Sequence, residues 1–370
     1  MAFPADCFSI AIPDNIVRFS SEIPDADEKG VRSLSPSREP LTVSEEILSK
    51  TAIVFPEKLP HPVLARAYND HAYVLKVSGD YHSAIEAYHR SIQLYEASVG
   101  RCSRSFVNVM RNVAVCYKDY AMWVGEEVEE GEEKKKKSDI EMERMGLLSR
   151  SREAAEDAVE WAEKWEDAVR DGQDVEGGEH VFTLKDLNDA RKERIGCEFV
   201  MAATYSAQSR ALTKENNTSS KSKKNVKTKS KVAHSILRKA EQTCRRALER
   251  GCMMEGIEPV DLVREGAKPS LPLCNGLNTL GVILKMKGQH FAKSKDERMS
   301  YYEEAESCYM KAYDVRARSL PKGHEDIVAT LFNMSEVMEG QERPHDAAKI
   351  RSFIMDELGI QDEEQSNSNE

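Results

Sequence analysis

Cysteine and histidine are the side chains most able to provide metal or nucleophilic chemistry, and this chain scatters both. Its eight cysteines form no C-x-x-C pair, and none stands at zinc-finger spacing from a histidine. Its nine histidines are also dispersed, and their spacing brings no convergent partners beside them. Most cysteines lie in apolar periodic stretches, where cysteine usually acts as a small hydrophobic residue. We therefore expect reduced thiols, no metal site and no cofactor.

Motifs for catalysis are missing from the sequence as well. It contains no glycine-rich phosphate loop, no H-E-x-x-H, no G-x-S-x-G and no EF-hand loop. Acidic residues are abundant, but carboxylates on amphipathic helices are normally solvated. The sequence therefore predicts a protein that is not an enzyme. Catalysis hidden in an insertion would need a cluster of perturbed groups, and the sequence provides none.

Composition restricts the partners and the compartment. The 370 residues carry a formal net charge of -11, which disfavours nucleic acid and anionic lipid as bulk partners. No apolar run approaches the roughly 18 residues of a membrane span. The opening residues lack the basic and apolar regions of a signal peptide. We expect a cytoplasmic protein, with the nucleus as an alternative, and no membrane span.

A helical pattern recurs along the chain and must position any functional side chain. In "LARAYNDHAYVLKVSGDYHSAIEAYHRSI", counting from Ala65 places Ala72 at position 8, Gly79 at 15 and Ala84 at 20. Small residues at positions 8 and 20 let two helices approach closely, while larger residues fill the space between them. The same order returns 42 residues later and then three more times, starting at Val107, Ile195, Cys274 and Val328.

One helix pair cannot bury both of its apolar faces, so neighbouring pairs must stack. The sequence therefore predicts an all-α solenoid of about five antiparallel helix pairs over residues 61–360. The repeats are spaced unevenly, and the excess length falls in polar stretches. This predicts polar insertions near 125–140, 213–231 and 289–300, which we expect to be loops.

The two ends of the chain lie outside the predicted array. Residues 1–60 are rich in Pro, Ser, Asp and Glu, and we expect them to be mostly disordered. Within them, Thr42 and Glu45 are spaced as a capping box, which favours a short helix at 42–55 covering the first repeat. Residues 361–370 should form a disordered acidic tail.

This pattern resembles the tetratricopeptide repeat, and its 42-residue spacing is similar to the kinesin light chain type. The segment "LPKGHEDIVATL" looks like the linker between repeats of that type. His324 precedes Val328 by four residues, as His61 precedes Ala65. The resemblance covers about 61–360, and it implies a superhelical array of helix pairs with one concave face.

The resemblance also implies a binding surface. In tetratricopeptide proteins the first helix of each pair lines a groove, and positions 2, 5, 6, 9, 12 and 13 point into it. Transferred by register, the partner-binding residues would be Arg66, Asn69, Tyr73, Lys76, Asn108, Arg111, Asn112, Lys118, Asn275, Asn278, Lys285 and Asn333. Asparagine suits this work because one amide both donates to and accepts from a peptide backbone. Alternatively, Asn112 and Asn333 only satisfy polar groups between helices.

The types of these residues limit the kinds of partner protein that the groove could bind. Repeats one and two would bring four cations to the groove, which favours a partner with an acidic segment: Arg66, Lys76, Arg111 and Lys118. A receptor for chaperone tails is disfavoured, because Asn69 and Tyr73 stand where such receptors need lysine and asparagine. A motor adaptor is also disfavoured, because residues 1–60 show no sustained heptad pattern.

We therefore expect a non-catalytic scaffold or adaptor that binds a protein, as a peptide or a helix, in the groove. The alternative is a structural subunit or assembly factor of a larger complex, in which the convex face and the insertions also make contacts. The lysine-rich stretch 214–231 fits a nuclear import signal or an anion-binding patch, and equally a solvated insertion.

Overall fold

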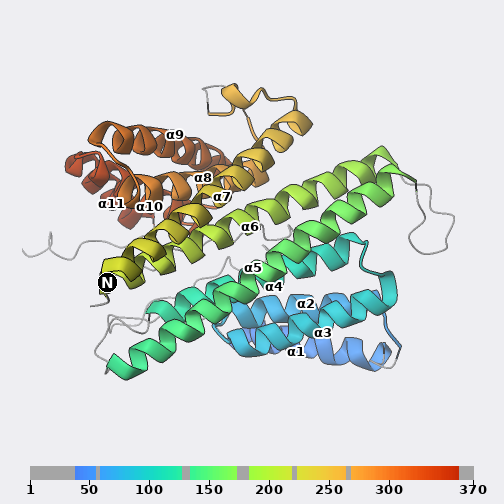
Figure 1. The fold of residues 1–370 in the computed structure, drawn as a ribbon. Helices are drawn as coiled ribbons and strands as arrows, with labels where there is room; N and C mark the ends of the chain where they lie inside the picture. The colour runs from blue at the N-terminus through green and yellow to red at the C-terminus, as the bar shows by residue number, and fades with distance from the viewer. Residues whose placement is uncertain are drawn as a thin grey trace, which may run out of the picture. The chain divides into compact units, whose positions relative to one another are not determined.

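The computed structural model describes residues 38–55, 59–126, 134–172, 183–218, 223–263 and 268–357. In these ranges it contains eleven α-helices, one short 3-10 helix and no strand (Figure 1), which confirms the all-α prediction. Disorder was expected over most of residues 1–60 and over 361–370; of these, residues 1–37, 56–58 and 361–370 lie outside the described residues.

None of the helices within the described ranges has a stretch apolar enough to span a membrane.

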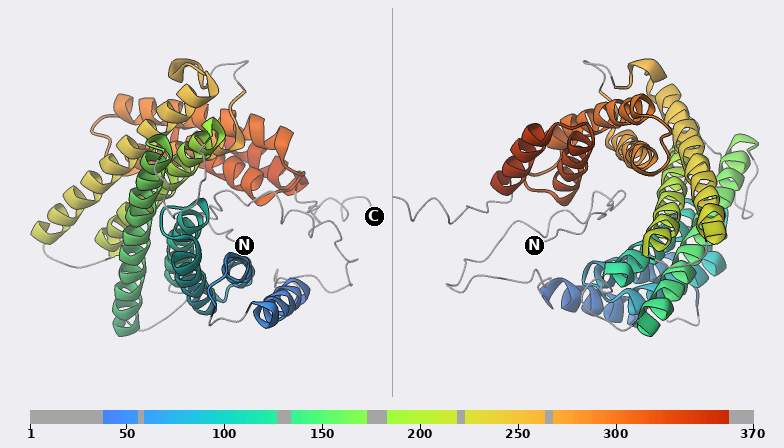
Figure 2. Two further views of the ribbon diagram at one scale, coloured as in Figure 1. Left: turned by 90° about the vertical axis from the view of Figure 1, so that its right-hand side faces the viewer. Right: turned by 60° about the vertical axis from the view of Figure 1, so that its left-hand side comes forward.

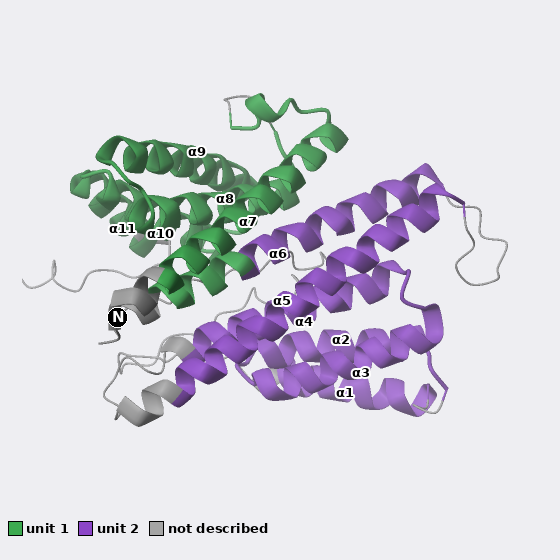
Figure 3. Ribbon diagram, viewed as in Figure 1, with its two compact units in different colours: residues 1–9, 205–370 green, residues 10–204 purple. Residues whose placement is uncertain are grey.

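The chain divides into two compact units (Figure 3), which are described separately below. Unit 2 comprises Ile10–Thr204, and unit 1 comprises Met1–Ser9 and Tyr205–Glu370. The boundary lies inside the long helix α6, Leu184–Thr218. We had expected one continuous array over 61–360, so this division was not anticipated.

Consecutive helices of unit 2 contact each other, the last two through side-chain hydrogen bonds, and α2 also contacts α4. These elements are α1 (Arg38–Val54), α2 (Pro62–Val77), α3 (Tyr81–Val99), α4 (Arg104–Glu126), α5 (Lys134–Arg170) and the first part of α6. Helix α1 spans the stretch in which we expected a short helix at 42–55, and it packs against α2. The contact between α2 and α4 places the first helices of two successive pairs beside each other.

Unit 1 repeats this arrangement. Consecutive helices pack from α7 to α11, and α8 also contacts α10. The elements that follow α6 are α7 (Lys223–Glu255), the 3-10 helix η3 (Pro259–Asp261), α8 (Leu271–His290), α9 (Lys295–Ser319), α10 (Glu325–Gly340) and α11 (Pro344–Glu357). Each unit therefore brings alternate helices as well as consecutive ones into contact.

The two histidines that precede a repeat have a physical role. The ring of His61 accepts a hydrogen bond from the backbone N–H of Val63 at 3.2 Å and caps α2. His324 caps α10 in the same way, through the N–H of Asp326 at 3.1 Å. Both rings satisfy a backbone N–H that the helix leaves without an internal partner. The shared linker histidine is thus explained by helix capping.

The polar insertions are more helical than we expected. Helix α6 continues to Thr218 and α7 begins at Lys223, so most of the stretch 213–231 extends these two helices. This stretch contains no proline or glycine, and its lysines are good helix formers. Near 289–300, only four residues separate α8 from α9. Polar composition in these stretches is therefore compatible with helix and does not by itself predict a loop.

The alanines at position 20 provide a stability test. Ala84 in α3 and Ala305 in α9 have no exposed surface, which fits a close helix–helix contact. Replacing either by leucine should lower the free energy of unfolding by about 1–3 kcal/mol through overpacking. The control is Ala97→Leu, because Ala97 is exposed on α3. Urea unfolding followed by circular dichroism measures the difference, and equal stability of all three variants would contradict the register.

Candidate interaction surface

Three of the predicted asparagines of unit 2 form one hydrogen-bonded chain across α2 and α4. The Asn112 amide nitrogen donates to the side-chain oxygen of Asn69 at 3.0 Å and to that of Asn108 at 3.2 Å. The Asn69 amide donates to the Asp70 carboxylate at 3.2 Å. The alternative that Asn112 satisfies a polar group between helices is therefore supported. Asn108 and Asn112 are half-buried, so they also stay within reach of a ligand.

Two predicted lysines meet at a carboxylate that the sequence reasoning missed. The Nζ of Lys76 lies 3.2 Å from one oxygen of Asp119, and that of Lys118 lies 2.8 Å from the other. Burial raises the pKa of Asp119, but the two ammonium groups outweigh burial and hold this pKa below its ordinary value. Asp119 stands at position 13 of its repeat, so the register itself could have identified it.

The other two cations are paired as well. Arg66 lies 3.6 Å from Asp70 on the exposed side of α2. Arg111 is buried and donates to Glu193 of α6 at 2.7 Å, beside Gly196, where a Cβ would lie only 2.7 Å from the guanidinium. These four cations share three carboxylates, Asp70, Asp119 and Glu193, so most of the positive charge expected in the groove is compensated in unit 2. Arg111 belongs to the contact between α4 and α6.

Exposure separates the predicted residues of unit 2 into two groups. Asn69, Arg111 and Lys118 are buried. Arg66 is exposed, and four others are half-buried: Tyr73, Lys76, Asn108 and Asn112. The Nζ of Lys76 also lies 5.4 Å from the centre of the Tyr73 ring. The accessible set thus offers amides, one aromatic ring and balanced charges along α2 and α4.

The predicted residues of unit 1 are all buried. Lys285 of α8 donates to the side-chain oxygen of Asn333 in α10 at 2.8 Å and to the Glu336 carboxylate. Burial lowers the pKa of Lys285 to about 8, although Glu336 acts in the opposite direction. Asn275 accepts from Arg316 at 2.6 Å. These contacts join α8 to its neighbours, which supports the alternative reading of Asn333 as a residue that satisfies an inter-helix polar group.

Asn278 differs from its neighbours in unit 1. Its side chain is 1% exposed, and neither its amide nitrogen nor its oxygen has a hydrogen-bond partner. A buried polar group without a partner costs about 1–3 kcal/mol. Asn278→Leu should therefore raise the free energy of unfolding by about 1 kcal/mol, as measured by urea denaturation.

The matched control for this substitution is Asn275→Leu. It removes the acceptor that Arg316 uses, so we expect a loss of stability. If Asn278→Leu also destabilises the chain, the amide of Asn278 has a partner and the interpretation of an unsatisfied group is wrong.

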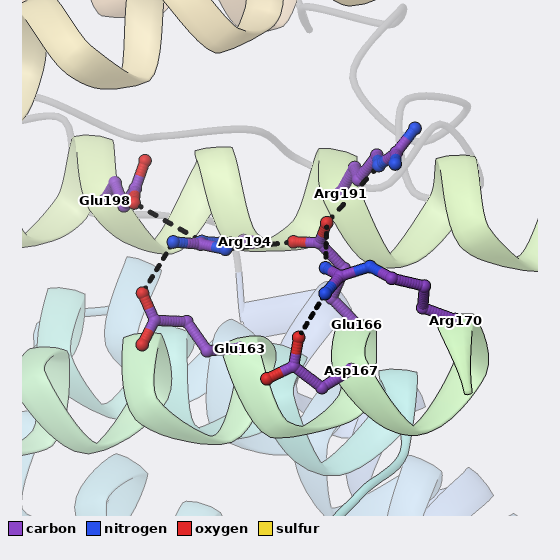
Figure 4. A network of polar contacts seen from close by, with 7 residues as sticks. All are labelled: Glu163, Glu166, Asp167, Arg170, Arg191, Arg194 and Glu198. Atoms are coloured by element: carbon purple, nitrogen blue, oxygen red, sulfur yellow. Dashed lines mark hydrogen bonds and ion pairs between the residues drawn. The ribbon is translucent and has the colours of Figure 1, made fainter. Parts of the chain in front are cut away.

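Ion pairs hold α5 and α6 together in unit 2 (Figure 4). Glu166 of α5 accepts from Arg170 and from the α6 residues Arg191 and Arg194, at 3.1, 3.3 and 3.1 Å. Arg194 also donates to Glu163 at 2.7 Å. Burial raises the pKa of Glu166, but the arginines hold it below its ordinary value. This network is structural, because its cations and carboxylates are used to join the two helices.

Histidine, cysteine and carboxylate side chains do not gather into a metal site in the part of the chain that the structure describes. Within these described residues, no group of three or more such side chains could bind a metal ion. Burial raises the pKa of Cys116 and of Cys197 to about 12, so at neutral pH neither is a thiolate.

Comparison with known proteins adds no relative. No model of a protein family matches the chain, and no curated protein is significantly similar to it. The function of the surface on α2 and α4 must therefore be inferred from its own residues.

Proposed function

We propose that this chain is a non-catalytic interaction scaffold, built from tetratricopeptide-like helix pairs, that binds a partner protein along α2 and α4. The observation that carries this proposal is the hydrogen bond between Asn69 of α2 and Asn112 of α4, at 3.0 Å. It joins the first helices of two successive pairs, so their polar residues form one continuous row. Contacts between α8 and α10 support the same repeating arrangement in unit 1.

The chemistry of this row defines the partner. The Asn112 amide nitrogen already donates to Asn69 and Asn108, so a ligand backbone would use the Asn112 oxygen as acceptor and the Asn108 amide as donor. Tyr73 adds an amphipathic ring of a kind enriched at protein interfaces. Asp70 and Asp119 lie beside Arg66 and Lys76 and compensate most of their charge, so the partner needs no acidic segment. Recognition would rest on hydrogen bonds and aromatic contact, and it should depend only weakly on salt.

The test begins with peptides selected from a phage-displayed random library on the full chain. Calorimetry then compares the affinity of a selected peptide for the wild type and for the double variant Tyr73→Ala, Asn108→Ala. We expect a loss of roughly tenfold or more, since each removed contact contributes about 0.5–1.5 kcal/mol.

The matched control is Asn188→Ala, because Asn188 is a half-buried asparagine on α6 and is not one of the residues of this row. Circular dichroism must show that all variants keep their helix content. If the double variant and the control bind the peptide as tightly as the wild type, the row on α2 and α4 is not the binding site.

A further inference from the structure

Helix α1 leaves apolar side chains uncovered. Val43, Ile47 and Val54 are 45%, 55% and 67% exposed. Every side chain described from Pro40 to Val54 is exposed or half-buried, although the helix packs against α2 and Ser44 lies 3.0 Å from a ring nitrogen of His71. In Figure 2, α1 is the blue helix at the edge of its unit. Single exposed hydrophobic residues are ordinary, but an ordered row needs an explanation.

Four of the exposed residues follow the spacing of a helix–helix seam, whereas Ile53, which is 78% exposed, lies outside this row. Val43, Ile47, Lys50 and Val54 are separated by four, three and four residues. This places them on one stripe of the helix, as the a and d positions of a coiled coil are placed. Lys50 interrupts the apolar row, and its Nζ lies 2.6 Å from Glu46 on the same helix. Both of these charged side chains are mostly exposed.

The spacing of the row, four, three and four residues, is the same from either end of the helix. If two such helices lie antiparallel around a two-fold axis, Val43 of each copy faces Val54 of the other, and Ile47 faces Lys50. Lys50 of one copy then lies beside Ile47 and within reach of Glu46 of the second copy. Val43 of each copy thus meets Val54 of the other. Lys50 covers Ile47 with its aliphatic stem while its charge reaches Glu46, so the contacts are reciprocal as a two-fold interface requires.

We propose that α1 is a dimerisation element that pairs antiparallel with α1 of a second copy of this chain. The row covers three helical turns, which is too short for an isolated pair of helices, so α2 must support each α1 from behind. The pairing covers Val43, Ile47 and Val54 and replaces the exposed ion pair within α1 by two ion pairs between copies. This element goes beyond the proposed binding row on α2 and α4.

Charge reversal provides the test. Sedimentation velocity of the full chain over a range of concentrations should show a reversible dimer. Lys50→Glu places two glutamates against each other across the axis, and Glu46→Lys places two lysines there. Each single variant should weaken dimerisation by roughly tenfold or more, because like charges in contact disfavour association. An equal mixture of the two variants should restore it, since each chain then meets the opposite charge.

The control is Ser49→Glu, which adds charge at an exposed position of α1 outside the row. It should dimerise like the wild type. A wild type that stays monomeric at every concentration overturns the proposal. A dimer that is unaffected by either charge reversal, or is not restored in the mixture, uses another surface and overturns it equally.

Discussion

Replacing Arg316 by alanine should lower the free energy of unfolding by about 3–5 kcal/mol. This side chain is 2% exposed and connects three helices of unit 1. From α9 it donates to Asn275 of α8 at 2.6 Å and to the backbone oxygen of Asp326 in α10 at 2.9 Å, and it also reaches Thr330. Its loss removes the donor to Asn275 and the bonds that tie α9 to α10, and it leaves the Asp326 carboxylate, whose pKa burial raises, without a nearby guanidinium.

The control for Arg316 is on the same helix. Arg318 is more than half exposed and pairs with Asp314, one turn away. Arg318→Ala should change the free energy of unfolding by no more than about 0.5 kcal/mol, because exposed ion pairs contribute little. Chemical denaturation monitored by circular dichroism measures both variants. Similar losses for the two would show that Arg316 does not hold the three helices together.

Replacing Gly281 by valine should cost about 3 kcal/mol, at the upper end of the usual range for overpacking. A Cβ at Gly281 would lie 2.7–3.0 Å from three ring carbons of Tyr309. That ring has no exposed surface, so it has no space into which to move. The α8–α9 contact therefore requires a residue without a side chain at this position.

The matched control is a Gly→Val substitution at an exposed helical position where a side chain has space. Gly146 of α5 is exposed, and a Cβ there would meet no atom within 4 Å. Gly146→Val should leave stability within about 0.5 kcal/mol of the wild type, since valine is a slightly better helix former than glycine. Thermal unfolding of both variants gives the comparison. A Gly281→Val chain as stable as the control would show that α8 and α9 are not packed this closely.

Local features of the fold could be predicted from the sequence. Helical periodicity and the small residues at positions 8 and 20 identified the paired helices, and Ala72, Ala84 and Ala305 are fully buried as that register requires. The linker histidines could also be located, because a cap depends only on neighbouring residues. Such features are encoded within one or two helical turns, where sequence spacing translates directly into geometry.

Charge pairing could not be predicted, because it depends on residues distant in the sequence. Glu193 neutralises Arg111 across 82 positions, and nothing in the register of either helix shows this. Lys76 meets Asp119 across 43 positions, so counting cations alone suggested a more basic groove than the structure has. Polar composition was misleading for a related reason. A polar stretch can be a loop, but it can equally be the continuation of a long helix such as α7.

Hydrogen exchange of the chain, alone and saturated with a library-selected peptide, tests the central claim most directly. The binding row on α2 and α4 predicts slower backbone exchange in these two helices, around Tyr73 and Asn108, with little change in α3 and α5. Slower exchange confined to α3, α5 or any helix outside the row, with α2 and α4 unchanged, would contradict the proposed function. A structural subunit that makes its contacts through the outer helices would then be the better account.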